Sequence, residues 1–134
     1  MLNPFPSLLT YSFWAPFILR VVVGFIFVDL GILAFKKEKE RWVISLATLG
    51  IPKQRLIVKI IGTLEIACGL MLIAGFYTQI AALILAIFTF AESYVEFKNP
   101  DILKRNLVFY VMLFVMVFSL VLTGAGALAF DLPL

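Results

Sequence analysis

Long apolar blocks alternate with short polar stretches along this chain. Four of these blocks are each close to the roughly 20 residues that a helix needs to cross the hydrocarbon core of a bilayer. They cover about residues 13–35, 57–76, 78–95 and 106–129. The pattern predicts an all-α fold, an integral membrane four-helix bundle that forms a single domain over residues 1–134.

A fifth apolar stretch, at about residues 41–50, is too short to cross a bilayer. Trp42, Leu46 and Leu49 recur in it at helical spacing, and Pro52 follows its end. We therefore expect a short interfacial helix in the loop between the first two spans.

Ten of the eleven basic residues lie in the two longer loops between spans. They are Lys36, Lys37, Lys39, Arg41, Lys53, Arg55, Lys59, Lys98, Lys104 and Arg105. Basic loops stay in the cytoplasm, so the two loops are predicted to be cytoplasmic and both termini outside. The formal charge of +3 therefore needs no nucleic acid to explain it, and the predicted partner is the lipid bilayer.

The composition agrees with a membrane protein and narrows its chemistry. The chain is 63% hydrophobic and 14% charged, whereas a soluble domain is about half apolar and about a quarter charged. Cys68 is the only cysteine and there is no histidine. A dithiol redox centre and histidine-ligated haem, copper or di-iron sites are thereby excluded. We expect no metal site and no intrinsic cofactor.

Small residues mark one face of each of the first two spans. Arg20, Gly24, Phe27 and Gly31 fall on one stripe of the first span. Glycines let membrane helices approach closely, so this stripe should face the bundle. Arg20 then either extends to the outer interface or takes part in a buried ion pair or ligand site.

Glu65 lies among the small residues of the second span, between Gly62, Cys68 and Gly69. An unpaired charge in such a tight helix contact would be costly, so Glu65 is either protonated or partnered on another helix. Its role is then to handle protons, to bind a ligand, or to hold two helices together by a hydrogen bond.

Two further carboxylates lie at a similar depth. Asp29, Glu65 and Glu92 each lie six or seven residues from a loop lysine, which is roughly 10 Å along a helix. Asp29 lies opposite Arg20 on its helix, so it either leans towards Lys36 or faces a second subunit. Equal depth is what a shared polar site would require.

Glu92 has aromatic neighbours that could hold a quinone ring, although aromatic residues are also usual at membrane interfaces. Phe88 shares its face and Tyr94 follows two residues later. The candidate polar pocket consists of Arg20, Glu65, Glu92 and Tyr94.

Several short motifs follow one another in a distinctive order. They are Leu19-Arg20, Gly24, Phe27, Gly31, Gly50-Ile51-Pro52, Gly62-x-x-Glu65-x-x-x-Gly69, Gly75-Phe76-Tyr77-Thr78, Ala81-Ala82 and Gly124-Ala125-Gly126, through to Asp131. In these motifs the chain resembles the DoxX/DoxD group of small four-span membrane proteins. It departs from that group at Leu30, where many members have histidine, and at Gln79, where many have a basic residue.

The resemblance implies redox biology at the membrane. DoxD-like proteins are subunits of a thiosulfate:quinone oxidoreductase, and DoxX-like proteins are linked to thiol-stress complexes. It therefore implies a quinone or quinol ligand and another redox subunit as partner.

Three functions remain open on the sequence. In the first, the chain is a membrane subunit of a quinone-linked oxidoreductase, and Arg20 and Glu65 shape the pocket. Alternatively, it is a small proton-coupled transporter of the four-span multidrug type, with Asp29 as the transport acid. The third alternative is a structural or assembly subunit whose polar residues only orient helices. The expected protein partner is either another redox subunit or further copies of this chain, as a homo-oligomer.

Overall fold

The computed structural model describes residues 6–36, 38–100 and 103–130, and these residues form helices and turns without a strand. The helices are η1 (Pro6–Tyr11), α1 (Trp14–Phe35), α2 (Lys39–Thr48), α3 (Gln54–Ala74), α4 (Thr78–Lys98) and α5 (Leu107–Thr123). The prediction of an all-α membrane bundle is confirmed.

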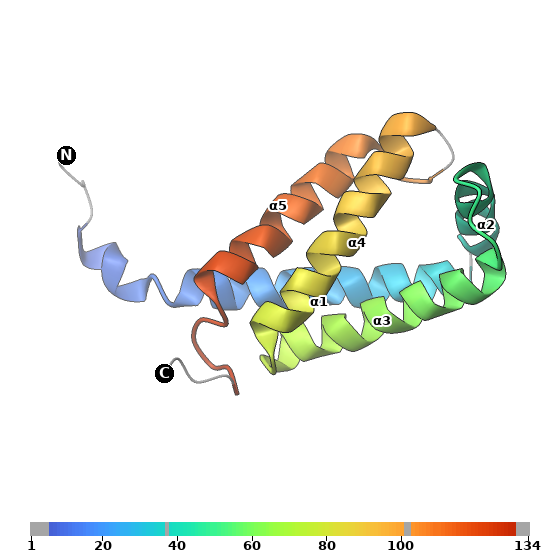
Figure 1. The fold of residues 1–134 in the computed structure, drawn as a ribbon. Helices are drawn as coiled ribbons and strands as arrows, with labels where there is room; N and C mark the ends of the chain where they lie inside the picture. Colours follow the sequence, from blue (N-terminus) through green and yellow to red (C-terminus); the bar gives the residue numbers. More distant parts are fainter. Residues whose placement is uncertain (1–5, 37, 101–102, 131–134) are drawn as a thin grey trace.

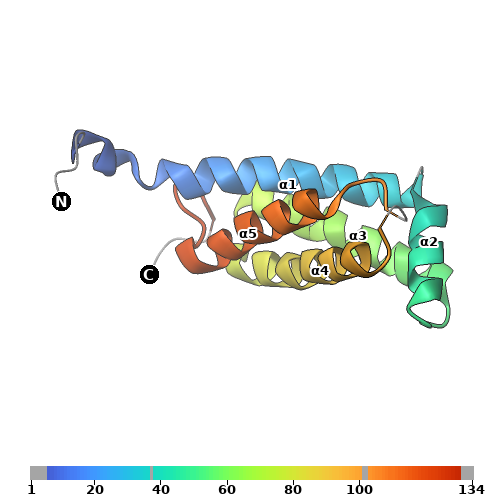
Figure 2. The same cartoon turned by 90° about the horizontal axis from the view of Figure 1, so that it is seen from above.

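Helices α1, α3, α4 and α5 form the bundle, and α2 lies across its end (Figure 1). Helix α1 packs mainly against α3, α4 packs mainly against α5, and α3 joins the two pairs by packing against α4. Figure 2 shows that α2 runs across the end of the bundle at which α1 ends and α3 begins. Trp42 and Leu46 are buried on the inner face of α2, while Ile44 is exposed.

Among the described helices, α1, α3 and α4 are long and apolar enough to cross a membrane, and α5 is apolar but shorter. The predicted end of the fourth span at residue 129 is wrong, because α5 ends at Thr123. Gly124 and Gly126 both have positive φ angles there, which glycine adopts readily. The chain then turns back, and the Ala127 N–H donates a hydrogen bond to the Phe13 carbonyl.

Helices α1 and α3 approach each other through their glycines. A Cβ atom added at Gly24 would lie 2.8 Å from the Gly69 carbonyl oxygen, and one added at Gly31 would lie 2.7 Å from that of Gly62. Both distances are shorter than any side-chain carbon tolerates, so neither Gly24 nor Gly31 can be enlarged without separating the two backbones.

We predict that Gly31→Val lowers the free energy of unfolding by at least ~2 kcal/mol, because the added carbons overpack this contact. Thermal unfolding of the detergent-solubilised protein would measure the loss. Ala91→Val is the matched control, since Ala91 is exposed on α4. An equal loss in both variants would contradict close packing at Gly31.

Candidate functional site

Two acidic side chains meet in the interior of the bundle. Glu65 of α3 is 1% exposed and Glu92 of α4 is 4% exposed. Their carboxyl groups are close enough to share a hydrogen bond. A carboxylate only accepts hydrogen bonds, so the two groups can share one only when one of them carries a proton.

The pair continues into three further polar side chains. Tyr110 of α5 is buried, and Arg105, just before α5, lies near it. Arg105 also forms an ion pair with Glu38, which immediately precedes α2; its Nη1 lies 3.0 Å from Oε2 and 3.1 Å from Oε1 of Glu38. We call Glu38, Glu65, Glu92, Arg105 and Tyr110 the carboxyl cluster.

Acidic groups outnumber cations in the carboxyl cluster. It holds three carboxyl groups and one guanidinium, and Glu96 adds another buried carboxyl group on α4. Oε1 of Glu65, Oε2 of Glu92 and Oε2 of Glu96 are buried and have no hydrogen-bond partner among the described residues. These oxygens are therefore suited to a proton or to a ligand that donates hydrogen bonds.

A metal ion is a poorer match to this arrangement. No group of three or more His, Cys, Asp or Glu side chains in the described part of the chain is placed to hold one.

The structure separates Arg20 from the predicted pocket. Arg20 is fully buried near the start of α1, and its guanidinium donates hydrogen bonds to the carbonyls of Ala125 at 2.9 Å and Leu128 at 3.0 Å. A Cβ atom at Gly75 would lie 2.8 Å from the Arg20 Cζ. Arg20 thus holds the segment after α5 against α1 and the α3–α4 turn, at the opposite end of the bundle from α2.

The other two candidates lie on the outside of the bundle. Tyr94 is 52% exposed, and the Lys98 Nζ lies 5.9 Å from the centre of its ring. Asp29 is exposed on α1, so its carboxyl group points away from the bundle rather than towards Glu65. Of the candidate pocket, the structure brings only Glu65 and Glu92 together.

Sequence reasoning missed Glu38, Arg105 and Tyr110. Glu38 lies among lysines and Arg105 lies in a basic loop, so both resemble solvated charges in the sequence. One local signal was available, since Asn106 caps α5 by accepting a hydrogen bond from the Phe109 N–H. That cap begins α5 directly after Arg105, which keeps Arg105 close to the first turns of α5.

Comparison with protein families matches residues 15–95 to DoxX, which is more than half of the chain. The chain belongs to the DoxX family. The resemblance inferred from the sequence motifs is thereby confirmed. No curated protein and no solved structure matches this DoxX protein. The matched region contains Glu65 and Glu92, whereas Arg105 and Tyr110 lie beyond it.

We predict that Arg105→Gln destabilises the protein by ~3 kcal/mol, because it leaves Glu38 buried without its cation. The double variant Glu38→Gln/Arg105→Gln should recover most of this loss, since it removes both charges. Chemical unfolding in detergent would measure the free energy of unfolding of the original protein, the single variant and the double variant. Lys104→Gln, at an exposed neighbouring position, is the control, and an equal loss there would contradict a specific ion pair.

Proposed function

We propose that this DoxX protein is a membrane subunit of a quinone-linked oxidoreductase, in which Glu65 and Glu92 pass protons to a bound quinone. The observation that supports this function is the buried carboxyl pair with one unpartnered oxygen on each member. A membrane-embedded acid of this kind marks a proton or ligand site by default.

The proposed reaction consumes protons at the pair. Reduction of a quinone to a quinol takes up two electrons and two protons, one proton on each ring oxygen. A partner subunit supplies the two electrons by oxidising a reduced donor, because this chain has neither a dithiol nor a histidine. Glu65 and Glu92 supply the protons, and the hydroxyl groups of the quinol product can then donate hydrogen bonds to their free oxygens.

The rest of the carboxyl cluster suits the return of protons. Tyr110 lies near Glu92 and Arg105, and Arg105 leads on to Glu38, which immediately precedes α2. Arg105 holds Glu38 in place. Protons can therefore be replaced from the end of the bundle that the positive-inside rule assigns to the cytoplasm.

A purely structural role explains the cluster less well. One hydrogen bond between helices needs one donor and one acceptor, both satisfied. Here several buried carboxyl groups share one cation and leave oxygens unpartnered, which lowers stability without any structural benefit. Such an arrangement is expected where function requires the acids.

The transporter remains a second candidate because of Asp29. Its carboxyl group is exposed on the outer face of α1, where a transport acid shared with a second subunit would lie. The two candidate functions therefore depend on different acids.

We predict that Glu65→Gln and Glu92→Gln each lower donor-driven quinone reduction about 100-fold, the typical effect of losing a general acid. The assay uses membranes from cells that also contain the partner subunits, with rates normalised to the amount of this protein. Asp29→Asn is the matched control and should leave the rate unchanged.

Proton-coupled efflux from vesicles, measured on the same variants, separates the alternatives. Loss of efflux in Asp29→Asn, with quinone reduction unaffected by either glutamate variant, would favour the transporter. Reduced protein levels with both activities normal per molecule would leave only the structural role.

A further inference from the structure

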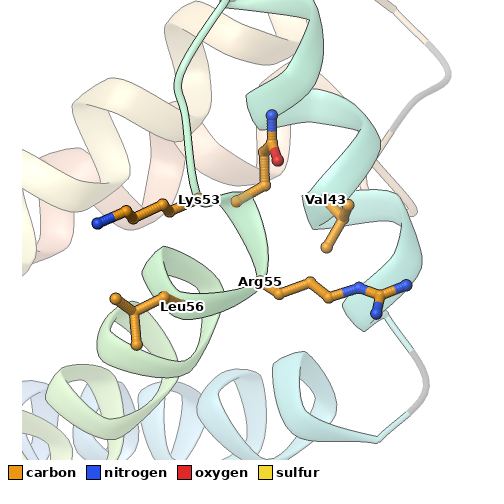
Figure 3. A pocket seen from close by; sticks show the side chains of 5 residues that line it. Val43, Lys53, Arg55 and Leu56 are labelled. Carbon is orange, nitrogen blue, oxygen red and sulfur yellow. The ribbon is translucent and has the colours of Figure 1, made fainter.

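A hollow of about 370 Å³ lies between α2 and the start of α3. Its walls are Val43, Lys53, Gln54, Arg55 and Leu56. Figure 3 shows Arg55 extending past Val43 of α2, with Lys53 on the other side of the start of α3. The hollow lies where α2 crosses the end of the bundle, and none of its lining residues belongs to the carboxyl cluster.

The charge of this hollow is positive and uncompensated. Lys53 and Arg55 are both exposed, and neither forms an ion pair with another described residue. Glu40 is the acidic residue of the adjoining α2, where Lys39 and Arg41 flank it. The surroundings therefore favour an anion.

An apolar stripe leads from the hollow along the surface of α3. Leu56 lines the hollow and is 54% exposed, and Ile60 is 49% exposed one turn further on. Leu64 is exposed after another turn, so the three side chains follow one face of the helix. This face runs from the end of the bundle into the membrane-crossing part of α3.

We propose that the hollow binds the phosphate headgroup of an anionic phospholipid, with an acyl chain lying along Leu56, Ile60 and Leu64. Arg55 can bind two phosphate oxygens at once. Lys53 points to the other side of the start of α3 (Figure 3), so it adds positive charge to the surroundings rather than a second contact to the same oxygens. Basic pockets beside membrane helices have this kind of ligand. The apolar stripe favours a lipid over free phosphate, because free phosphate would use only the hollow.

The test measures lipid binding to the purified full-length protein in a neutral detergent at about 0.15 M salt, where weak long-range attraction is screened. The apparent melting temperature is followed while a short-chain phosphatidylglycerol is added, since a ligand of the folded state raises it. Phosphatidylcholine with the same chains and inorganic phosphate are added in separate titrations.

The variant pair is Lys53→Gln/Arg55→Gln against Lys98→Gln/Lys104→Gln. Each removes two exposed positive charges from the same end of the bundle, but only the first changes the hollow. We expect phosphatidylglycerol to bind the first double variant at least about tenfold more weakly, because each basic residue at a membrane surface contributes about fivefold. The second double variant should bind within about threefold of the original protein. Leu56→Ser should weaken lipid binding without affecting inorganic phosphate.

Other results would overturn the proposal. Equal weakening in both double variants would mean that the lipid senses only the general positive charge of this end. Inorganic phosphate binding as tightly as phosphatidylglycerol would mean that the hollow recognises phosphate without the lipid. Phosphatidylcholine binding as tightly as phosphatidylglycerol, unaffected by either double variant, would mean an ordinary lipid contact.

Discussion

The close approach of α1 and α3 is the constraint on which the rest of the bundle depends. Where Gly24 meets Gly69 and Gly31 meets Gly62, backbone lies against backbone, and the rotation of α3 about its axis is fixed. Glu65 lies between the two glycines of α3, so that rotation also fixes its direction. The carboxyl group is held at the edge of the contact and meets Glu92 of α4.

Polar groups gather at the two ends of the bundle for different reasons. At one end, Arg20 binds carbonyls after α5 and holds the segment that follows the last helix. Those carbonyls lie in the turn that follows α5, where helical hydrogen bonds do not reach them. Towards the other end, the carboxyl cluster contains more acid than its single guanidinium can neutralise. The first arrangement stabilises the fold, whereas the second lowers stability and is the better guide to function.

The proposed quinone chemistry and the proposed lipid site use separate parts of the chain. The buried pair Glu65–Glu92 faces the interior, while Lys53 and Arg55 face outwards beside α2. Both nevertheless depend on α2. It lies across the end of the bundle next to Glu38 and also forms one wall of the basic hollow. A lipid bound in that hollow would thus lie near the route by which protons are proposed to reach the pair.

The sequence by itself determined the membrane class, the positions of α1 to α4 and the family, because apolar block length and glycine spacing are local properties of the chain. It also singled out Glu65 through its glycine neighbours. It misplaced the end of α5, since apolar residues such as Leu128 continue past the turn at Gly124. Only the tertiary structure decided that Glu92 joins Glu65 and that Arg20 does not. Depth along a helix can be counted from a sequence, but which faces meet depends on how four helices rotate against one another. The ion pair of Glu38 with Arg105 depends on the same packing, which brings together loops that are far apart in the chain.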